Sequence, residues 1–138
     1  MCLIATAWRP GSAWPLVMAA NRDEFFDRPS APAQWWQTHP DVLAGQDLLA
    51  GGTWLGINRL GAFAALTNVR ASNRAVAQRS RGHLPSSWLI SQSKTARLDT
   101  KRQDEVLHAA QAAFRQGRDY GGFHLLLGRL RTTESTES

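Results

Sequence analysis

Residues 51–70, GGTWLGINRLGAFAALTNVR, have the pattern of an antiparallel β-hairpin. Two apolar runs, 53–58 and 62–68, flank the short turn RLG at 59–61. A short turn that contains glycine between two strand-length runs is typical of a hairpin, because glycine tolerates the backbone angles of a tight reversal. We therefore expect 53–58 and 62–68 to be neighbouring antiparallel strands.

Other apolar runs predict further strands. The runs 3–8 and 15–20 are separated by PGSAWP, whose prolines and glycine indicate a turn, and FHLLLGRL at 123–130 predicts one more strand. Segment 28–41, RPSAPAQWWQTHPD, contains three prolines. Because proline donates no backbone hydrogen bond, we expect a loop or covering segment there, not a helix or a central strand. The glycines of GQDLLAGGTWLG, at 45–56, are expected in turns.

Helices are expected in the second half of the chain. HLPSSWLIS at 83–91 predicts a short helix that starts near Pro85, and 101–116 carries apolar side chains at helical spacing. Strands first and helices later, without βαβ alternation, predict an α+β fold. The polar tail RTTESTES at 131–138 has no core residue and is expected to be disordered, which leaves 1–130 as one domain.

Composition limits the class of protein. The 138 residues are 43% hydrophobic, yet no apolar run reaches the roughly 18 residues of a membrane span, so stable membrane insertion is not expected. The lack of a secretory signal and the single cysteine favour a cytoplasmic protein without a disulfide framework. The four histidines are far apart, and no phosphate-binding or haem-attachment motif is present, so neither a metal nor a cofactor is expected.

The net charge of +5 is concentrated in the second half of the chain. Residues 70–138 hold twelve Lys and Arg against six acidic residues, whereas 1–69 hold four Arg against five. The basic residues are scattered and accompany no nucleic-acid-binding motif. A solvated basic face is therefore expected, and nucleic acid is not an expected partner.

Two places in the sequence carry candidate chemistry. The apolar run PLVMA leads directly into NRDEFFD at 21–27, which is either a solvent-exposed turn or a strand end that delivers polar groups to a site. Cys2 follows the initiator Met1. After removal of Met1, its free amine and its thiol would be a base and a nucleophile in one residue. The alternative is a small buried hydrophobic residue that opens a strand.

Four motifs in register resemble the NRDE family, also called the Transport and Golgi organisation protein 2 family. They are MCLI at the N-terminus, AANRDEFFDRP, AGQDLLAGGTWLGINRLGAFAALTNVR and SRGHL. The resemblance covers nearly the whole chain as far as YGGFHLLLGRL, and it corresponds to an N-terminal portion of the longer family members. The tail TTESTES does not resemble the family's continuation, which suggests a truncated or frameshifted product.

The NRDE family is in turn similar to N-terminal nucleophile (Ntn) hydrolases of the choloylglycine hydrolase and penicillin V acylase kind. This resemblance implies an αββα sandwich of mainly antiparallel strands, incomplete in a chain of this length. It assigns Cys2 as the nucleophile, Asp23 as the carboxylate that orients the amine, and Asn68 as the oxyanion donor. Asn21, Arg22 and Trp54 are then expected to contact substrate. Arg22 and Glu24 have a structural alternative, which is pairing with Arg28 or Asp47.

Two functions follow from the resemblance. The first is an Ntn-type cysteine hydrolase that cleaves an amide or thioester of an acylated small molecule. The second is a non-enzymatic protein that handles haem or an acyl-CoA or other lipid, linked to Golgi organisation and secretion in eukaryotic relatives. Such a carrier needs a hydrophobic cleft, which tryptophans could line. Because strand 123–130 is expected to have an unpaired edge and an apolar face, self-association is also expected.

Overall fold

The computed structural model describes residues 2–69, 79–93, 112, 115 and 120–130. The elements with defined bounds are β1 (Leu3–Trp8), β2 (Leu16–Asn21), β3 (Ser30–Trp35), β4 (Val42–Asp47), β5 (Leu55–Asn58), β6 (Ala62–Asn68), α1 (His83–Ser93) and β7 (Phe123–Arg129). The strands predicted at 3–8, 15–20, 53–58, 62–68 and 123–130 are confirmed within two residues at each end, as is the helix predicted at 83–91.

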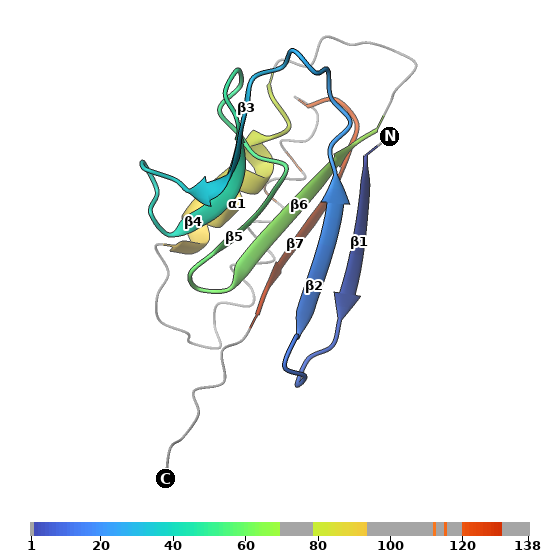
Figure 1. Cartoon of the computed structure of the whole chain (residues 1–138), viewed down its shortest axis with the longest axis vertical. Coiled ribbons are helices and arrows are strands. Elements are labelled where there is room, and N and C mark those ends of the chain that lie inside the picture. The colour runs from blue at the N-terminus through green and yellow to red at the C-terminus, as the bar shows by residue number, and fades with distance from the viewer. Residues whose placement is uncertain (1, 70–78, 94–111, 113–114, 116–119, 131–138) are drawn as a thin grey trace.

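The strands form two separate sheets (Figure 1). β1 and β2 make a two-stranded hairpin, and the other strands form a five-stranded sheet in the order β3-β4-β5-β6-β7. Every pair of neighbouring strands is antiparallel, and β5 and β6 pair as the opening hairpin predicts. The described part of the chain is therefore a mainly antiparallel α+β fold.

Helix α1 covers one face of the five-stranded sheet, against β5 and β6. The sheet presents small residues to the helix, because Ala44, Gly56 and Ala64 are paired across three neighbouring strands. A Cβ on Gly56 would lie 2.7 Å from a methyl group of Leu89, so the helix approaches the sheet as closely as glycine allows. Trp88 and Leu89 are buried in the resulting core.

The β1–β2 hairpin lies against the opposite face of the sheet. In β6, Phe63 precedes Ala64 and therefore points away from α1. Its ring centroid lies 6.3 Å from that of Trp8 in β1. The described chain thus has three layers, which are the hairpin, the five-stranded sheet and the helix (Figure 1).

The prediction of a loop over 28–41 was wrong for its central part. Ser30–Trp35 form β3, which pairs with β4 at the edge of the five-stranded sheet. An edge strand can contain Pro32 because only one of its sides must donate and accept hydrogen bonds. The register shifts between Ala31 and Gln34, so an irregularity in the pairing accommodates the proline.

Strand β4 was not predicted, because its glycine was assigned to a turn. A Cβ on Gly45 would lie 2.8 Å from the Trp54 ring, so this glycine makes room for that tryptophan within the sheet. Gly51, in contrast, lies in a turn with φ of 83°, as expected.

The tail predicted to be disordered at 131–138 lies outside the described residues. So does the helix predicted at 101–116, except for residues 112 and 115, which are helical. No helix within the described residues is long and apolar enough to cross a membrane.

Candidate functional site

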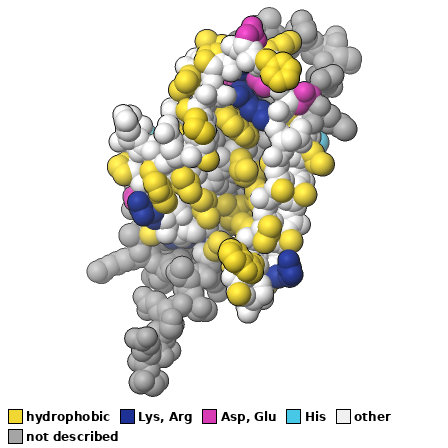
Figure 2. All heavy atoms as spheres, in the orientation of Figure 1, with side chains coloured by type: hydrophobic (Ala, Val, Ile, Leu, Met, Phe, Trp, Pro, Cys, Tyr) yellow, Lys and Arg dark blue, Asp and Glu magenta, His cyan; other side chains and the backbone are white. Residues whose placement is uncertain are grey.

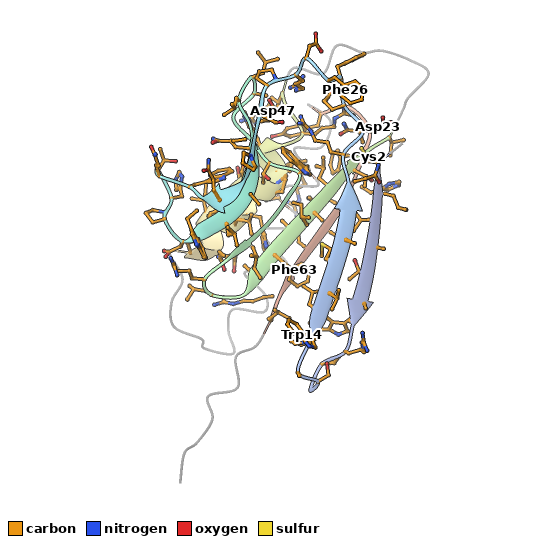
Figure 3. All side chains as sticks on the ribbon, viewed as in Figure 1. Cys2, Trp14, Asp23, Phe26, Asp47 and Phe63 are labelled. Carbon is orange, nitrogen blue, oxygen red and sulfur yellow. The ribbon has the colours of Figure 1, made fainter. Side chains whose placement is uncertain are left out.

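Cys2 and Asp23 lie next to each other at one end of the β1–β2 hairpin (Figure 3). The backbone N–H of Asp23 donates a hydrogen bond to Cys2 Sγ at 3.4 Å. Because Leu3 pairs with Asn21, the antiparallel register brings the residues before β1 and after β2 to the same end. The Leu3 N–H also donates to Asn21 Oδ1 at 2.9 Å. The hairpin therefore fixes the position of the thiol.

A cavity of about 270 Å³ opens beside Cys2. We call it the arginine pocket, because four arginines help to line it: Arg22, Arg28, Arg79 and Arg81. Asn68, at the end of β6, lines the same pocket as Cys2. So do Asn21, Arg22 and Trp54, which were expected to contact substrate. The structure thus brings five of the six predicted site residues to one cavity and places the sixth, Asp23, against Cys2 through its backbone.

Asp47 joins the NRDE segment to the end of β4. Its Oδ2 accepts hydrogen bonds from Arg22 at 2.9 Å and from Arg28 Nε at 2.8 Å. Its Oδ1 accepts the backbone N–H groups of Leu49 and Ala50, both at 3.0 Å. Glu24 adds weaker contacts to the same arginines, 3.6 and 3.8 Å away. Arg22 therefore pairs with Asp47 and Glu24 with Arg28, which confirms the structural alternative for these two residues. Figure 2 shows such basic and acidic groups together at this end of the molecule.

These contacts lower the pKa of Asp47. Burial alone would raise it, but the hydrogen bond from the Ala50 N–H, the hydrogen bond and charge of Arg28, and the Leu49 N–H outweigh burial. Arg22 is held on the pocket wall by the same carboxylate, and its guanidinium lies 4.3 Å from the Trp54 ring centroid. Its charge is therefore compensated within the protein.

Asp47 should make stability depend on acid pH. A carboxyl whose folded pKa is lowered stabilises the fold fully above its unfolded pKa, about 3.9, and this contribution is lost as the pH falls through the folded pKa. We expect Asp47→Asn to destabilise the protein at pH 6 by about 2–3 kcal/mol. The difference from wild type should shrink steadily below about pH 4. Urea unfolding at several pH values tests this, and a difference that stays constant down to pH 2 would contradict it.

The loop before α1 contributes site residues that the sequence did not predict. Arg79, Ser80, Arg81 and Gly82 line the arginine pocket. The loop is held there because the Thr53 N–H donates to the Gly82 carbonyl at 3.1 Å. A Cβ on Gly52 would lie 2.3 Å from the Gly82 backbone, so the close approach requires glycine at 52. The motif SRGHL, at 80–84, contains three of these four residues, but the family resemblance that it supports assigns none of them to the site.

A second cavity, of about 370 Å³, also has Cys2 in its wall. We call it the apolar groove; β1 lines it with Leu3, Ile4 and Thr6, and β6 and β7 with Thr67, His124, Leu125 and Leu126. It therefore runs between the two sheets. Thr67 Oγ1 and His124 Nδ1 are 3.3 Å apart, within hydrogen-bond distance. The aliphatic side chains supply most of the remaining wall.

The tryptophans have different environments. Trp36 and Trp88 are buried in the core, whereas Trp8, Trp14 and Trp35 are 43–73% exposed. Of the six, Trp54 lines the arginine pocket. Among the described residues, no group of three His, Cys, Asp or Glu side chains could hold a metal ion.

Comparisons with known proteins agree with the sequence resemblance. A family model described as Transport and Golgi organisation 2 matches residues 1–138. The mouse Transport and Golgi organization 2 homolog and the human Transport and Golgi organization protein 2 homolog are each 35% identical over 97% of this chain and 47% of their own length. The Drosophila melanogaster Transport and Golgi organization protein 2 is 41% identical over 40% of this chain and 20% of its own. The chain therefore spans about half the length of the mouse and human relatives.

Proposed function

The chain belongs to the Transport and Golgi organisation 2 family, and on this premise we propose that it acts as an Ntn-type cysteine hydrolase. Its substrate would be an amide or thioester of an acylated small molecule. The observation that carries the proposal is the position of Cys2, whose Sγ accepts the Asp23 N–H at the wall of a cavity that Asn68 also lines. A nucleophile, an adjacent acid and an amide donor around one cavity are the parts that acyl transfer needs.

In this proposal, removal of Met1 frees the Cys2 amine to act as the base. The Asp23 carboxylate orients that amine, and the Asp23 N–H positions the sulfur. The Asn68 amide donates to the oxyanion that forms as the sulfur attacks the carbonyl carbon. Asn21 and Trp54 contact the substrate, and Arg22 supports the pocket wall.

The layer order supports the related proposal of an Ntn-like sandwich. The hairpin, the five-stranded sheet and α1 correspond to three consecutive layers of an αββα arrangement. In such an arrangement a further helical layer would cover the outer face of the hairpin, where Val17 is 45% exposed. Self-association through exposed apolar surface is an alternative way to cover it.

Replacing Asn68 by alanine tests the oxyanion assignment. Because Asn68 is exposed at the end of β6, we expect its loss to change the free energy of unfolding by less than about 0.5 kcal/mol. Turnover of an acyl amide should nevertheless fall about a hundredfold, the usual cost of one oxyanion donor. A loss confined to KM, with kcat unchanged, would show that Asn68 binds substrate and does not stabilise the oxyanion.

The apolar groove favours a second candidate function, that of a non-catalytic carrier of an acyl compound or haem. Both functions would use the surface around Cys2, but only the hydrolase needs a free N-terminal cysteine. Intact-mass analysis for Met1 loss, combined with labelling by an electrophilic acyl probe, separates them. Retention of Met1 and an unreactive thiol, together with binding of the probe's uncleaved analogue, would favour the carrier.

A further inference from the structure

Cys2 is shared by two cavities of opposite character. The arginine pocket and the apolar groove both include this residue in their walls. Among the residues that the structure describes, the pocket is lined by four arginines against the two acids Glu24 and Asp47, which leaves an excess of two positive charges. In the described part of the chain, the wall of the groove contains no Lys, Arg, Asp or Glu. A molecule bound across Cys2 would therefore meet cationic surface at one end and aliphatic surface at the other.

The excess charge belongs to Arg79 and Arg81. Arg22 and Arg28 both pair with Asp47, at 2.9 and 2.8 Å. Arg81 instead donates to the carbonyl of Gly122 at 2.9 Å, and Arg79 lies over the Tyr120 ring at 5.8 Å. Within the described residues, neither guanidinium has a carboxylate in ion-pair range. A carbonyl and an aromatic ring occupy these groups without neutralising them, so an anion in the pocket would gain charge-assisted hydrogen bonds.

The groove fits an unbranched apolar chain. Its walls come from two sheets that face each other, and Ile4 and Leu126 contribute from opposite sides. Thr67 Oγ1 and His124 Nδ1 are within hydrogen-bond distance of each other, so a hydrocarbon chain that covers them would leave this contact in place. Leu126 is 39% exposed, which leaves apolar surface for a ligand to cover.

We propose that the substrate is amphiphilic, with an apolar acyl chain in the groove and an oxyanion-bearing leaving group in the arginine pocket. The inference rests on the proposed hydrolase function and assigns Arg79 and Arg81 as specificity-determining residues. The Cys2 sulfur bonds to the carbonyl carbon, and the bond from that carbon to the leaving group breaks. The leaving group departs with the electron pair and takes a proton from the Cys2 ammonium. Water then cleaves the thioester, which releases the carboxylic acid and restores the thiol.

Three matched amides test the anionic end: N-octanoylglycine, its methyl ester, and N-octanoyl-aminomethylphosphonate. Release of the amine can be followed by fluorescamine. We expect kcat/KM for the carboxylate to exceed that of the neutral ester about 10- to 100-fold, the range of charge-assisted hydrogen bonds. The ratio of carboxylate to phosphonate shows which oxyanion the pocket prefers.

Variants separate recognition from a purely structural role. Arg79→Gln and Arg81→Gln should each reduce the acid-to-ester ratio of kcat/KM about tenfold, because only the acid interacts with the charge that these variants remove. Arg59→Gln is the charge-matched control, because Arg59 contacts Asp41 and Trp35 and lies outside both cavities. If the arginines only hold Gly122 and Tyr120 in place, the variants will lose stability and will slow both substrates equally. That outcome would overturn the assignment.

The apolar end is tested by chain length. From N-acetylglycine to N-octanoylglycine, kcat/KM should rise about two- to fourfold for each methylene that the groove covers. Leu126→Asn should flatten this dependence, whereas Leu48→Asn, in an exposed turn outside both cavities, should not. A wild-type protein that cleaves short and long amides equally would overturn the placement of the chain.

Failure of the inference differs from failure of the proposed function. Cleavage of the acid and the ester at equal rates overturns the inference and leaves the hydrolase intact. Binding of N-octanoylglycine in preference to its ester, without cleavage by wild type, overturns the hydrolase and supports amphiphile recognition at these cavities. Tryptophan fluorescence of the Cys2→Ser variant measures that binding, since Trp54 lines the pocket. If the acid and the ester bind equally and neither is cleaved, the hydrolase function and the amphiphile inference are both overturned.

Discussion

Replacement of Cys2 by serine is expected to remove nearly all turnover of an acyl amide. Cys2 is the only cysteine in the chain, and in the proposed mechanism its sulfur forms the bond to the acyl carbon. A hydroxyl of nearly the same size is a much weaker nucleophile at neutral pH, so kcat should fall at least about a thousandfold. Affinity for the uncleaved substrate should stay within about twofold, because the rest of both cavities is unchanged.

The Cys2→Ala variant completes this experiment. It removes the hydroxyl as well, so any residual turnover of the serine variant that depends on that oxygen disappears. Because Sγ accepts the Asp23 N–H at an exposed position, neither variant should change the urea midpoint appreciably. Turnover equal to wild type in the serine or alanine variant, with N-termini verified by mass, would eliminate Cys2 as the nucleophile.

The parts of the fold that the sequence predicts are those set by neighbouring residues. The β5–β6 hairpin follows from two apolar runs and a glycine turn, and Gly61 has the positive φ, 80°, that such a turn uses. β3 and β4 depend on the sheet as a whole. Pro32 is acceptable in a strand only because β3 is at the edge, and Gly45 is needed only because Trp54 lies over it. Neither condition is visible in the local pattern.

The candidate site shows the same division. The family resemblance selected Cys2, Asp23 and Asn68, and the hairpin register and the end of β6 do bring them to one place. Arg79 and Arg81 could not be assigned, because their loop reaches the pocket through a backbone contact between Gly52 and Gly82, far apart in the sequence. Asp47 is an expected structural partner for Arg22, and the structure shows that it accepts hydrogen bonds from both Arg22 and Arg28.

The largest loss of stability is expected from Asn58→Ala. Asn58 is 3% exposed and lies at the end of β5, beneath the last turn of α1. Its Oδ1 accepts the N–H groups of Leu60 and Ala62, at 3.0 and 2.9 Å, and so closes the β5–β6 turn. Its Nδ2 donates to the Leu89 carbonyl at 3.1 Å and to Ser93 Oγ at 3.3 Å, and so ties that turn to the helix. One side chain thus joins two elements through all four of its hydrogen-bonding positions.

Alanine at position 58 would remove all four hydrogen bonds and leave the Ala62 N–H buried without this partner, so we expect a loss of about 3–5 kcal/mol in the free energy of unfolding. Asn58→Asp separates the contribution of the hydrogen bonds within the turn from that of the hydrogen bonds to the helix. The carboxylate can still accept both N–H groups of the turn, but it cannot donate to Leu89 and would face that carbonyl with a negative charge. Asn68→Ala, at an exposed position, is the matched control and should unfold within about 0.5 kcal/mol of wild type. If Asn58→Ala unfolds at the same urea concentration as Asn68→Ala, then packing alone holds the turn against the helix, and the hydrogen bonds of Asn58 contribute no net stability.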